Sequence, residues 1–126
     1  MNENLILVLL VIAGGSIGAL LRFGISMAMP NTGGITWGIL LVNLIGCTLI
    51  TMIFFSFDLS NQMRVFVFVG IFGAFTTMSS VSLDTLSLFS DGKEMLALSN
   101  FALNMTVCVG GGFLGKFASS ALTSIL

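Results

Sequence analysis

Charge is scarce in this sequence: of 126 residues, four are Lys or Arg, five are Asp or Glu, and none is His. A typical soluble domain has about 25% charged residues, whereas this chain has 7%, too few to cover the surface of a water-soluble fold. Four cations also cannot neutralise a phosphate backbone, which excludes nucleic acid as a partner. The absence of His, with only two Cys, excludes zinc sites and Ser-His-Asp triads. We therefore expect a membrane protein and not an enzyme.

Hydrophobic residues make up 56% of the chain and are concentrated in long runs. A helix needs about 20 apolar residues to cross a bilayer, and four such runs are separated by short segments rich in Pro, Gly, Asn, Asp or Ser. The predicted membrane-spanning helices are residues 5–29, 35–57, 63–90 and 94–125. The expected fold is therefore an all-α membrane protein, a single four-helix transmembrane domain over residues 1–126 that lies in the lipid bilayer of the cell (plasma) membrane as a multi-pass protein.

The four cations favour neither orientation in the membrane. Cytoplasmic loops usually carry the excess of Lys and Arg. Here Arg64 and Lys116 belong to the side with both termini, and Arg22 and Lys93 belong to the opposite side. This even distribution predicts dual topology, in which the chain inserts both ways and forms an antiparallel dimer. The alternative is that so few charges do not determine orientation.

One arginine and one asparagine fall within the first two predicted helices, where charged and strongly polar groups are unfavourable and usually functional. Arg22 lies about 25 Å along the first helix at about 1.5 Å per residue. It is either an arginine that extends to the membrane surface from a helix end or a fixed cation at a pore mouth. Asn43 lies among Leu and Val in the second helix. Its amide either joins two helices by a hydrogen bond or donates to an anion in a pore.

The third hydrophobic run becomes polar half-way along. After the apolar residues 65–72 come Gly73 and five hydroxyl side chains, those of Thr76, Thr77, Ser79, Ser80 and Ser82. Gly and hydroxyl side chains weaken a helix, so we predict a broken third helix. Irregular backbone at membrane depth is tolerated only when it is buried in protein or lines a cavity. The freed carbonyls can coordinate a cation and the hydroxyls can donate to an anion. The alternative is that Ser and Thr bond back to their own helix.

The fourth predicted helix has a modest polar stripe. Asn100, Asn104 and Cys108 are spaced four residues apart and share one helix face. The stripe either lines a pore or lies in a helix interface.

Buried acidic residues are missing from the centre of every predicted span. Asp84, Asp91 and Glu94 cluster near one interface. A proton-coupled exporter of this size needs a buried acid that exchanges protons for substrate. Hydroxyls, amides and one arginine without such an acid therefore favour an anion channel over a small four-helix proton-coupled exporter, which remains an alternative.

Three segments resemble motifs of the CrcB/Fluc family of fluoride channels. Residues 14–23, GGSIGALLRF, resemble the first-helix motif GGxxGAxxR, and residues 37–43, WGILLVN, are similar to WGTxxVN. Residues 70–84, GIFGAFTTMSSVSLD, resemble the third-helix signature GxxGGxTTFSTFSxE. The motifs occur in the same order as in the family and fall on three of the four predicted helices.

The resemblance implies an antiparallel dimer with two pores along its interface, which export fluoride passively. It also implies a structural sodium ion at the dimer centre, held by the main-chain carbonyls of Gly73 and Thr76. By position, Arg22 would line the vestibule and Asn43 the pore, and Asp84 replaces a glutamate near the pore end. With Asn104 from the polar stripe, the remaining residues of the predicted anion pathway are Met78, Ser79, Ser80, Val81 and Ser82.

The sequence departs from the family pattern at three predicted pore positions. Met78 and Val81 replace two phenylalanines whose electropositive ring edges face the ion, and Ile39 stands where threonine is usual. A thioether and an isopropyl group offer no such ring edge. The chain is then either a homodimeric channel with altered conduction or one half of a heterodimer whose sister Fluc chain supplies the phenylalanines. A non-conducting structural subunit is a further alternative.

Overall fold

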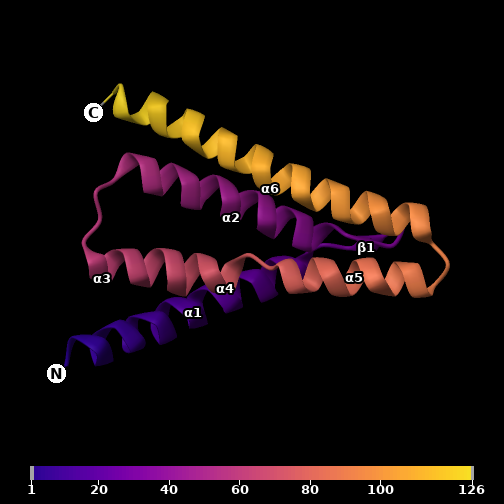
Figure 1. Cartoon of the computed structure of the whole chain (residues 1–126), viewed down its shortest axis with the longest axis horizontal. Helices are drawn as coiled ribbons and strands as arrows, with labels where there is room; N and C mark the ends of the chain where they lie inside the picture. The colour runs from indigo at the N-terminus through magenta and orange to yellow at the C-terminus, as the bar shows by residue number, and fades with distance from the viewer. Residues whose placement is uncertain (1, 126) are drawn as a thin grey trace.

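The computed structural model describes residues 2–125, which form four long helical spans that alternate in direction (Figure 1). Helices α1 (Glu3–Ala28), α2 (Trp37–Ser56) and α6 (Glu94–Thr123) are three of the spans. The other span consists of four successive segments: α3 (Asn61–Arg64), η1 (Val65–Phe72), α4 (Gly73–Phe75) and α5 (Met78–Ser90). The predicted all-α membrane fold is confirmed, since all four spans are long and apolar enough to cross a membrane. Each predicted boundary lies within two residues of the observed one.

A small β-hairpin that was not predicted from the sequence joins α1 to α2. Strand β1 (Asn31–Thr32) pairs in antiparallel fashion with β2 (Ile35–Thr36). Gly33 and Gly34 between them have φ values of 67° and 84°. Two consecutive positive φ angles are typical of a tight type I′ turn, which glycine adopts without steric strain. The hairpin therefore delays the start of α2 until Trp37.

Large apolar side chains are more often exposed than buried. In the most apolar window of each span, at most 28% of the residues are buried. The hydrophobic core is correspondingly small and centres on Val42, Phe72 and Phe75. Leaving a large apolar side chain in water instead of burying it costs about 1.5–3 kcal/mol, so the outward faces require lipid or another chain around them. The protein is therefore a multi-pass membrane protein.

Glycines allow the spans to approach closely where they cross. A Cβ atom added to Gly14 of α1 would lie 2.5 Å from the Phe66 carbonyl oxygen and 3.0 Å from the Gly70 Cα of η1. Between α2 and α6, a Cβ added to Gly115 would collide with the Thr48 carbonyl oxygen. Close backbone contact through small residues is how membrane helices associate, so these glycines form interfaces within one chain.

The third span is not one continuous α-helix. η1 is a π-helix, the wider form in which an N–H group bonds a carbonyl five residues earlier; the N–H of Gly73 accordingly donates to the carbonyl of Phe68. After Phe75 the chain is extended, with φ −77° and ψ 152° at Thr76 and φ −149° and ψ 114° at Thr77. Figure 1 shows this extended stretch between α4 and α5. It lies within the segment where the hydroxyl-rich sequence predicts a break.

Two neighbouring glycines of α1 provide a test of this packing. We expect Gly14→Ala to lower the free energy of unfolding by about 1–3 kcal/mol, because the new methyl group would overlap the backbone of η1. A Cβ at Gly15 meets nothing within 4 Å, so Gly15→Ala is the matched control. It should change stability by no more than about 0.5 kcal/mol. Equilibrium unfolding in detergent micelles measures both variants, and equal losses would contradict the assigned α1–η1 contact.

Candidate functional site

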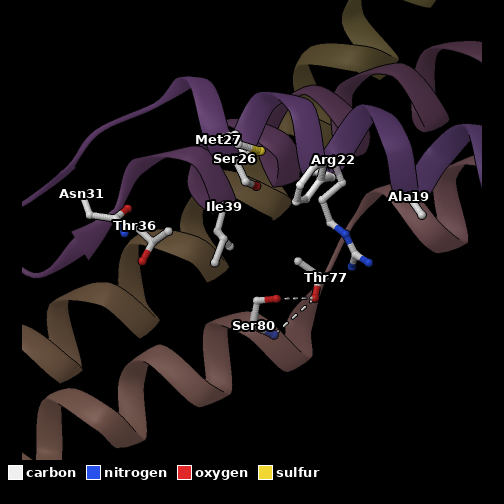
Figure 2. A pocket seen from close by; sticks show the side chains of 10 residues that line it. Ala19, Arg22, Ser26, Met27, Asn31, Thr36, Ile39, Thr77 and Ser80 are labelled. Carbon is white, nitrogen blue, oxygen red and sulfur yellow. Dashed lines mark hydrogen bonds between the residues drawn. The ribbon is translucent and has the colours of Figure 1, made fainter.

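An open cavity of about 450 Å³ lies between α1, the hairpin and the break in the third span. Figure 2 shows Arg22 extending from α1 toward Thr77, with Thr77 and Ser80 at the start of α5. Thr36 lines the cavity from strand β2, and Ile39 lines it from the beginning of α2. The remaining lining residues are Ala19, Phe23, Ser26, Met27 and Asn31.

Arg22 supplies an uncompensated positive charge to this cavity. The ion pairs within residues 2–125 are Arg64–Asp58, at 3.5 Å, and Lys93–Asp91, at 3.8 Å. Neither pair includes Arg22, and the cavity lining contains no carboxylate. The structure therefore places Arg22 at a cavity, and its role as a fixed cation in an anion pathway stays a prediction.

Three hydroxyls form a cluster at the start of α5. The Thr77 Oγ1 accepts a hydrogen bond from the Ser80 backbone N–H at 3.2 Å and lies 3.0 Å and 3.1 Å from the Oγ atoms of Ser79 and Ser80. Thr77 is thus the N-cap of α5. The N-terminus of a helix carries a partial positive charge, so the cap places hydroxyl donors and a positive helix end at the same cavity as Arg22.

A second polar cavity, of about 220 Å³, adjoins the first one. Asn31 and Thr36 line both cavities, and Asp84 lines the second. Ser80 and Asp84 are four residues apart on α5 and share one face of that helix. One face of α5 therefore carries a polar path from Arg22 toward the end of the bundle where Asp91 and Lys93 lie.

Asn43 and Asn104 are buried together and line neither cavity. Asn43 is 3% exposed and Asn104 is 1% exposed. The Nδ2 group of Asn43 donates to the Thr77 carbonyl at 3.3 Å and to the Asn104 Oδ1 at 3.1 Å, and its Oδ1 accepts from the Thr77 N–H at 2.9 Å. An amide NH2 group has two hydrogens, and both are occupied. Of the two interpretations of Asn43, the structure matches the hydrogen bond between helices.

Four other predicted pathway residues also lie outside both cavities. Met78 is 47% exposed, and Ser79 and Ser82 are likewise exposed on the outer face of α5. Val81 is fully buried within the chain. A single chain thus brings Arg22, Ser80 and Asp84 to the cavities but leaves the outer face of α5 open.

Thr77 is the most informative residue absent from the predicted pathway, although it lies in the hydroxyl-rich segment that predicts the break. Its position directly before α5 is the signal that could have identified it, because Thr is a favoured N-cap residue. Ser26, Asn31 and Thr36 were also not predicted. They come from α1 and the hairpin, and no motif spacing connects them with the third span.

The break removes the usual hydrogen-bond donors from the main-chain carbonyls that precede α5, including those of Gly73 and Thr76. In a continuous α-helix, the N–H of Thr77 would donate to the Gly73 carbonyl, and the N–H of Ser80 would donate to the Thr76 carbonyl. Here the Thr77 N–H donates to Asn43 and the Ser80 N–H donates to the Thr77 hydroxyl. The carbonyls of Gly73 and Thr76 are therefore free of these helical donors, and oxygen atoms of this kind suit a hard cation.

Comparison with known proteins identifies relatives over most of the chain. The sequence model of the family described as "CrcB-like protein, Camphor Resistance (CrcB)" matches residues 9–116. A "Fluoride-specific ion channel FluC" from Shewanella halifaxensis (strain HAW-EB4) is 39% identical over 114 residues, which cover 86% of this chain and 92% of that protein. Its namesake from Pyrococcus abyssi (strain GE5 / Orsay) is 37% identical over 116 residues, covering 89% and 94% of the two chains. A third protein of that name, from Parabacteroides distasonis, is 40% identical over 116 residues, covering 88% and 91%.

The N-cap at the break predicts a difference between two substitutions of one residue. Thr77→Val removes the hydroxyl that accepts from Ser80, so we expect it to lower the free energy of unfolding by about 1 kcal/mol. Thr77→Ser keeps the hydroxyl and should remain within about 0.5 kcal/mol of the parent protein. Denaturant unfolding followed by circular dichroism measures the difference. The same loss in both variants would show that the hydroxyl contributes no capping bond.

Proposed function

We propose that this chain, which belongs to the CrcB-like protein family, is a subunit of a fluoride-selective channel. The channel would export cytosolic fluoride passively across the cell membrane. The relatives named above as fluoride-specific ion channels support this function, because they match this chain over most of its length. The structural observation that carries the proposal is the guanidinium of Arg22, which forms no ion pair within residues 2–125 and shares one cavity with the hydroxyls of Thr77 and Ser80.

The chemistry of the cavity suits a small, strongly hydrated anion. A selective pore must replace the water around an ion with groups of its own. Thr77 and Ser80 provide hydroxyl donors, while Arg22 and the N-terminus of α5 provide positive potential. A membrane potential favours anion exit by about 2.3 kcal/mol per charge per 100 mV, so no coupled driving ion is required.

A second chain would complete the pathway as an antiparallel dimer. The outer face of α5 exposes Met78, Ser79 and Ser82, which line no cavity within one chain. A partner packed on this face would convert it into the wall of a pore. The even division of cations between the two ends of the bundle supports a partner of opposite orientation.

A structural sodium ion fits the main-chain oxygens at the break. The carbonyls of Gly73 and Thr76 would hold it, since the Thr77 and Ser80 N–H groups donate elsewhere. Two carbonyls are fewer ligands than hard cations usually take, so the same pair from a second chain would complete the site. When bound, the ion would add a fixed positive charge near the anion pathway.

A heterodimer remains the second candidate, and one observation favours it. Met78 occupies an exposed position on α5 where the family resemblance implies a phenylalanine, while Val81 is buried. A sister chain that carries both phenylalanines would then supply the aromatic edges of one pore. The proton-coupled exporter has less support, because Asp84, the acid lining the polar path, lies toward its end and is absent from the cavity of Arg22.

Fluoride efflux from lipid vesicles tests the proposed function. Vesicles that contain this chain alone are loaded with fluoride, and an ionophore sets the membrane potential in the absence of a pH gradient. Rapid efflux under these conditions identifies a homodimeric channel. Efflux only after a sister chain is added identifies the heterodimer, and efflux only with a pH gradient identifies an exporter.

Substituting Arg22 and Arg64 in turn distinguishes the effect of the charge in the cavity on fluoride efflux from the effect of the protein's total charge. We expect Arg22→Gln to reduce fluoride efflux by about tenfold or more, which corresponds to about 1.4 kcal/mol of lost stabilisation of the anion. Arg64→Gln is the matched control, because Arg64 pairs with Asp58 outside both cavities. Initial efflux rates at equal protein content provide the comparison. Equal rates in the two variants would remove Arg22 from the pathway.

A further inference from the structure

Asn43 pairs with the main chain of the third span in a two-point contact. Its Oδ1 accepts from the Thr77 N–H at 2.9 Å, and its Nδ2 donates to the Thr77 carbonyl at 3.3 Å. Residues on neighbouring antiparallel strands exchange the same two bonds. The side chain of α2 thus takes the place of the helical partner that Thr77 would otherwise use, and it holds the chain extended at this residue.

The contact continues as a chain of amides that returns to the third span. Asn43 Nδ2 donates to Asn104 Oδ1 at 3.1 Å, and Asn104 Nδ2 donates to the Asn100 carbonyl at 3.0 Å and to its Oδ1 at 3.4 Å. Asn100 Nδ2 then donates to the Thr85 Oγ1 at 3.1 Å. We call the residues Asn43, Asn104, Asn100 and Thr85 the amide relay. It begins at Thr77, before α5, and ends at Thr85 within α5.

The direction of the relay is set by one main-chain atom. A carbonyl oxygen only accepts hydrogen bonds, so the Asn100 carbonyl requires the Nδ2 of Asn104 to face it. The Oδ1 of Asn104 must then face α2, where it can accept a hydrogen bond only from the Nδ2 of Asn43 and not from its Oδ1. With its Nδ2 on the Asn104 side, Asn43 can donate to the Thr77 carbonyl and accept from the Thr77 N–H through its Oδ1. All three asparagines are at most 3% exposed, so water does not replace these partners.

We propose that Asn104 is a positioning residue that fixes the amide orientation of Asn43 and so maintains the break in the third span. Asn104 lines neither of the two cavities described above, and its effect on an ion pathway passes through Asn43 and Thr77. The break in turn places the Thr77 hydroxyl in the cavity and frees the carbonyls of Gly73 and Thr76. The assignment of Asn104 to the break stands on the hydrogen bonds alone, whereas its effect on ion flow rests on the proposed function.

Hydrogen exchange at the Thr77 amide tests the relay without any transport measurement. NMR of the labelled full-length chain in lipid nanodiscs compares the parent with Asn104→Asp, which keeps the size of the side chain but removes its donor. Asn104→Leu removes both polar groups. We expect Thr77 exchange to become about tenfold faster in both variants, since one buried hydrogen bond is weakened. Thr77 also lines the cavity, so solvent reaches its amide once it is released.

A neighbouring threonine provides the matched control. Thr106 lies on the same helix, is exposed, and bonds only to the Ala102 carbonyl of its own helix at 2.8 Å. Thr106→Leu should leave Thr77 exchange unchanged. If Asn104→Leu gives no folded protein, the test uses Asn104→Asp together with Thr85→Val. The Thr85→Val variant removes the hydroxyl that accepts from Asn100 at the end of the amide relay. Unchanged Thr77 exchange in the folded Asn104 and Thr85 variants would overturn the proposal.

Sodium dependence of efflux provides the functional arm of the test. We expect Asn104→Asp to raise the sodium concentration for half-maximal fluoride efflux about tenfold, because the Gly73 and Thr76 carbonyls are then less well placed. Thr106→Leu should match the parent. Sodium dependence that is the same in all three proteins, despite faster Thr77 exchange in Asn104→Asp, would overturn the link from the relay to the ion site. Absence of fluoride efflux in the parent protein would refute the proposed function, while the exchange experiment still decides the role of Asn104.

Discussion

Backbone polar groups in a bilayer must find partners inside the protein, and at Thr77 that partner is a side chain. A continuous helix satisfies every N–H and C=O internally, whereas an interrupted one exposes several of these groups to hydrocarbon. Asn43 accepts from the Thr77 N–H and donates to its carbonyl, so the interruption is stabilised from α2. The start of α5, the position of its capping hydroxyl and the freed carbonyls of Gly73 and Thr76 all depend on this pairing.

The polar groups of the chain are sorted into three environments. The asparagines of the amide relay are buried and hydrogen-bonded to one another. Arg22, Thr77 and Ser80 face a cavity that they share. Ser79 and Ser82 face away from the chain. This sorting explains why a sequence with so few charges still presents a positive, donor-rich surface at one place in the bundle.

The sequence predicts the spans well because their signal is local. Long apolar runs between turn residues set four helices with boundaries correct to within two residues, and the hydroxyl-rich segment indicates where the third span becomes irregular. The π-helix of Val65–Phe72 has no such signal, since an apolar run looks the same in either helix form. The hairpin was missed because its strands are only two residues long each.

The candidate site was predictable only in part, because burial depends on which helix faces which. Asn43 and Asn104 stand out in sequence as polar residues in apolar runs, but their mutual contact joins residues 61 positions apart. Arg22, Ser80 and Asp84 reach the cavities as predicted pathway residues, whereas Ser79 and Ser82 lie on a different face of α5. Helical spacing groups residues on one helix. It does not reveal which group meets the neighbouring helix.

The π-helical segment η1 also determines the direction around the helix axis in which the residues after it, including Thr77 and those of α5, point. Successive residues of an α-helix are rotated by about 100° around its axis, and η1 turns by less per residue because its turns are wider. If Val65–Phe72 rewound as an ordinary α-helix, Thr77 would swing around the axis and away from Asn43. A one-residue insertion or deletion in this apolar stretch would leave its hydrophobicity almost intact and yet turn the polar face of α5 out of alignment, so the length of η1 is constrained more tightly than its composition.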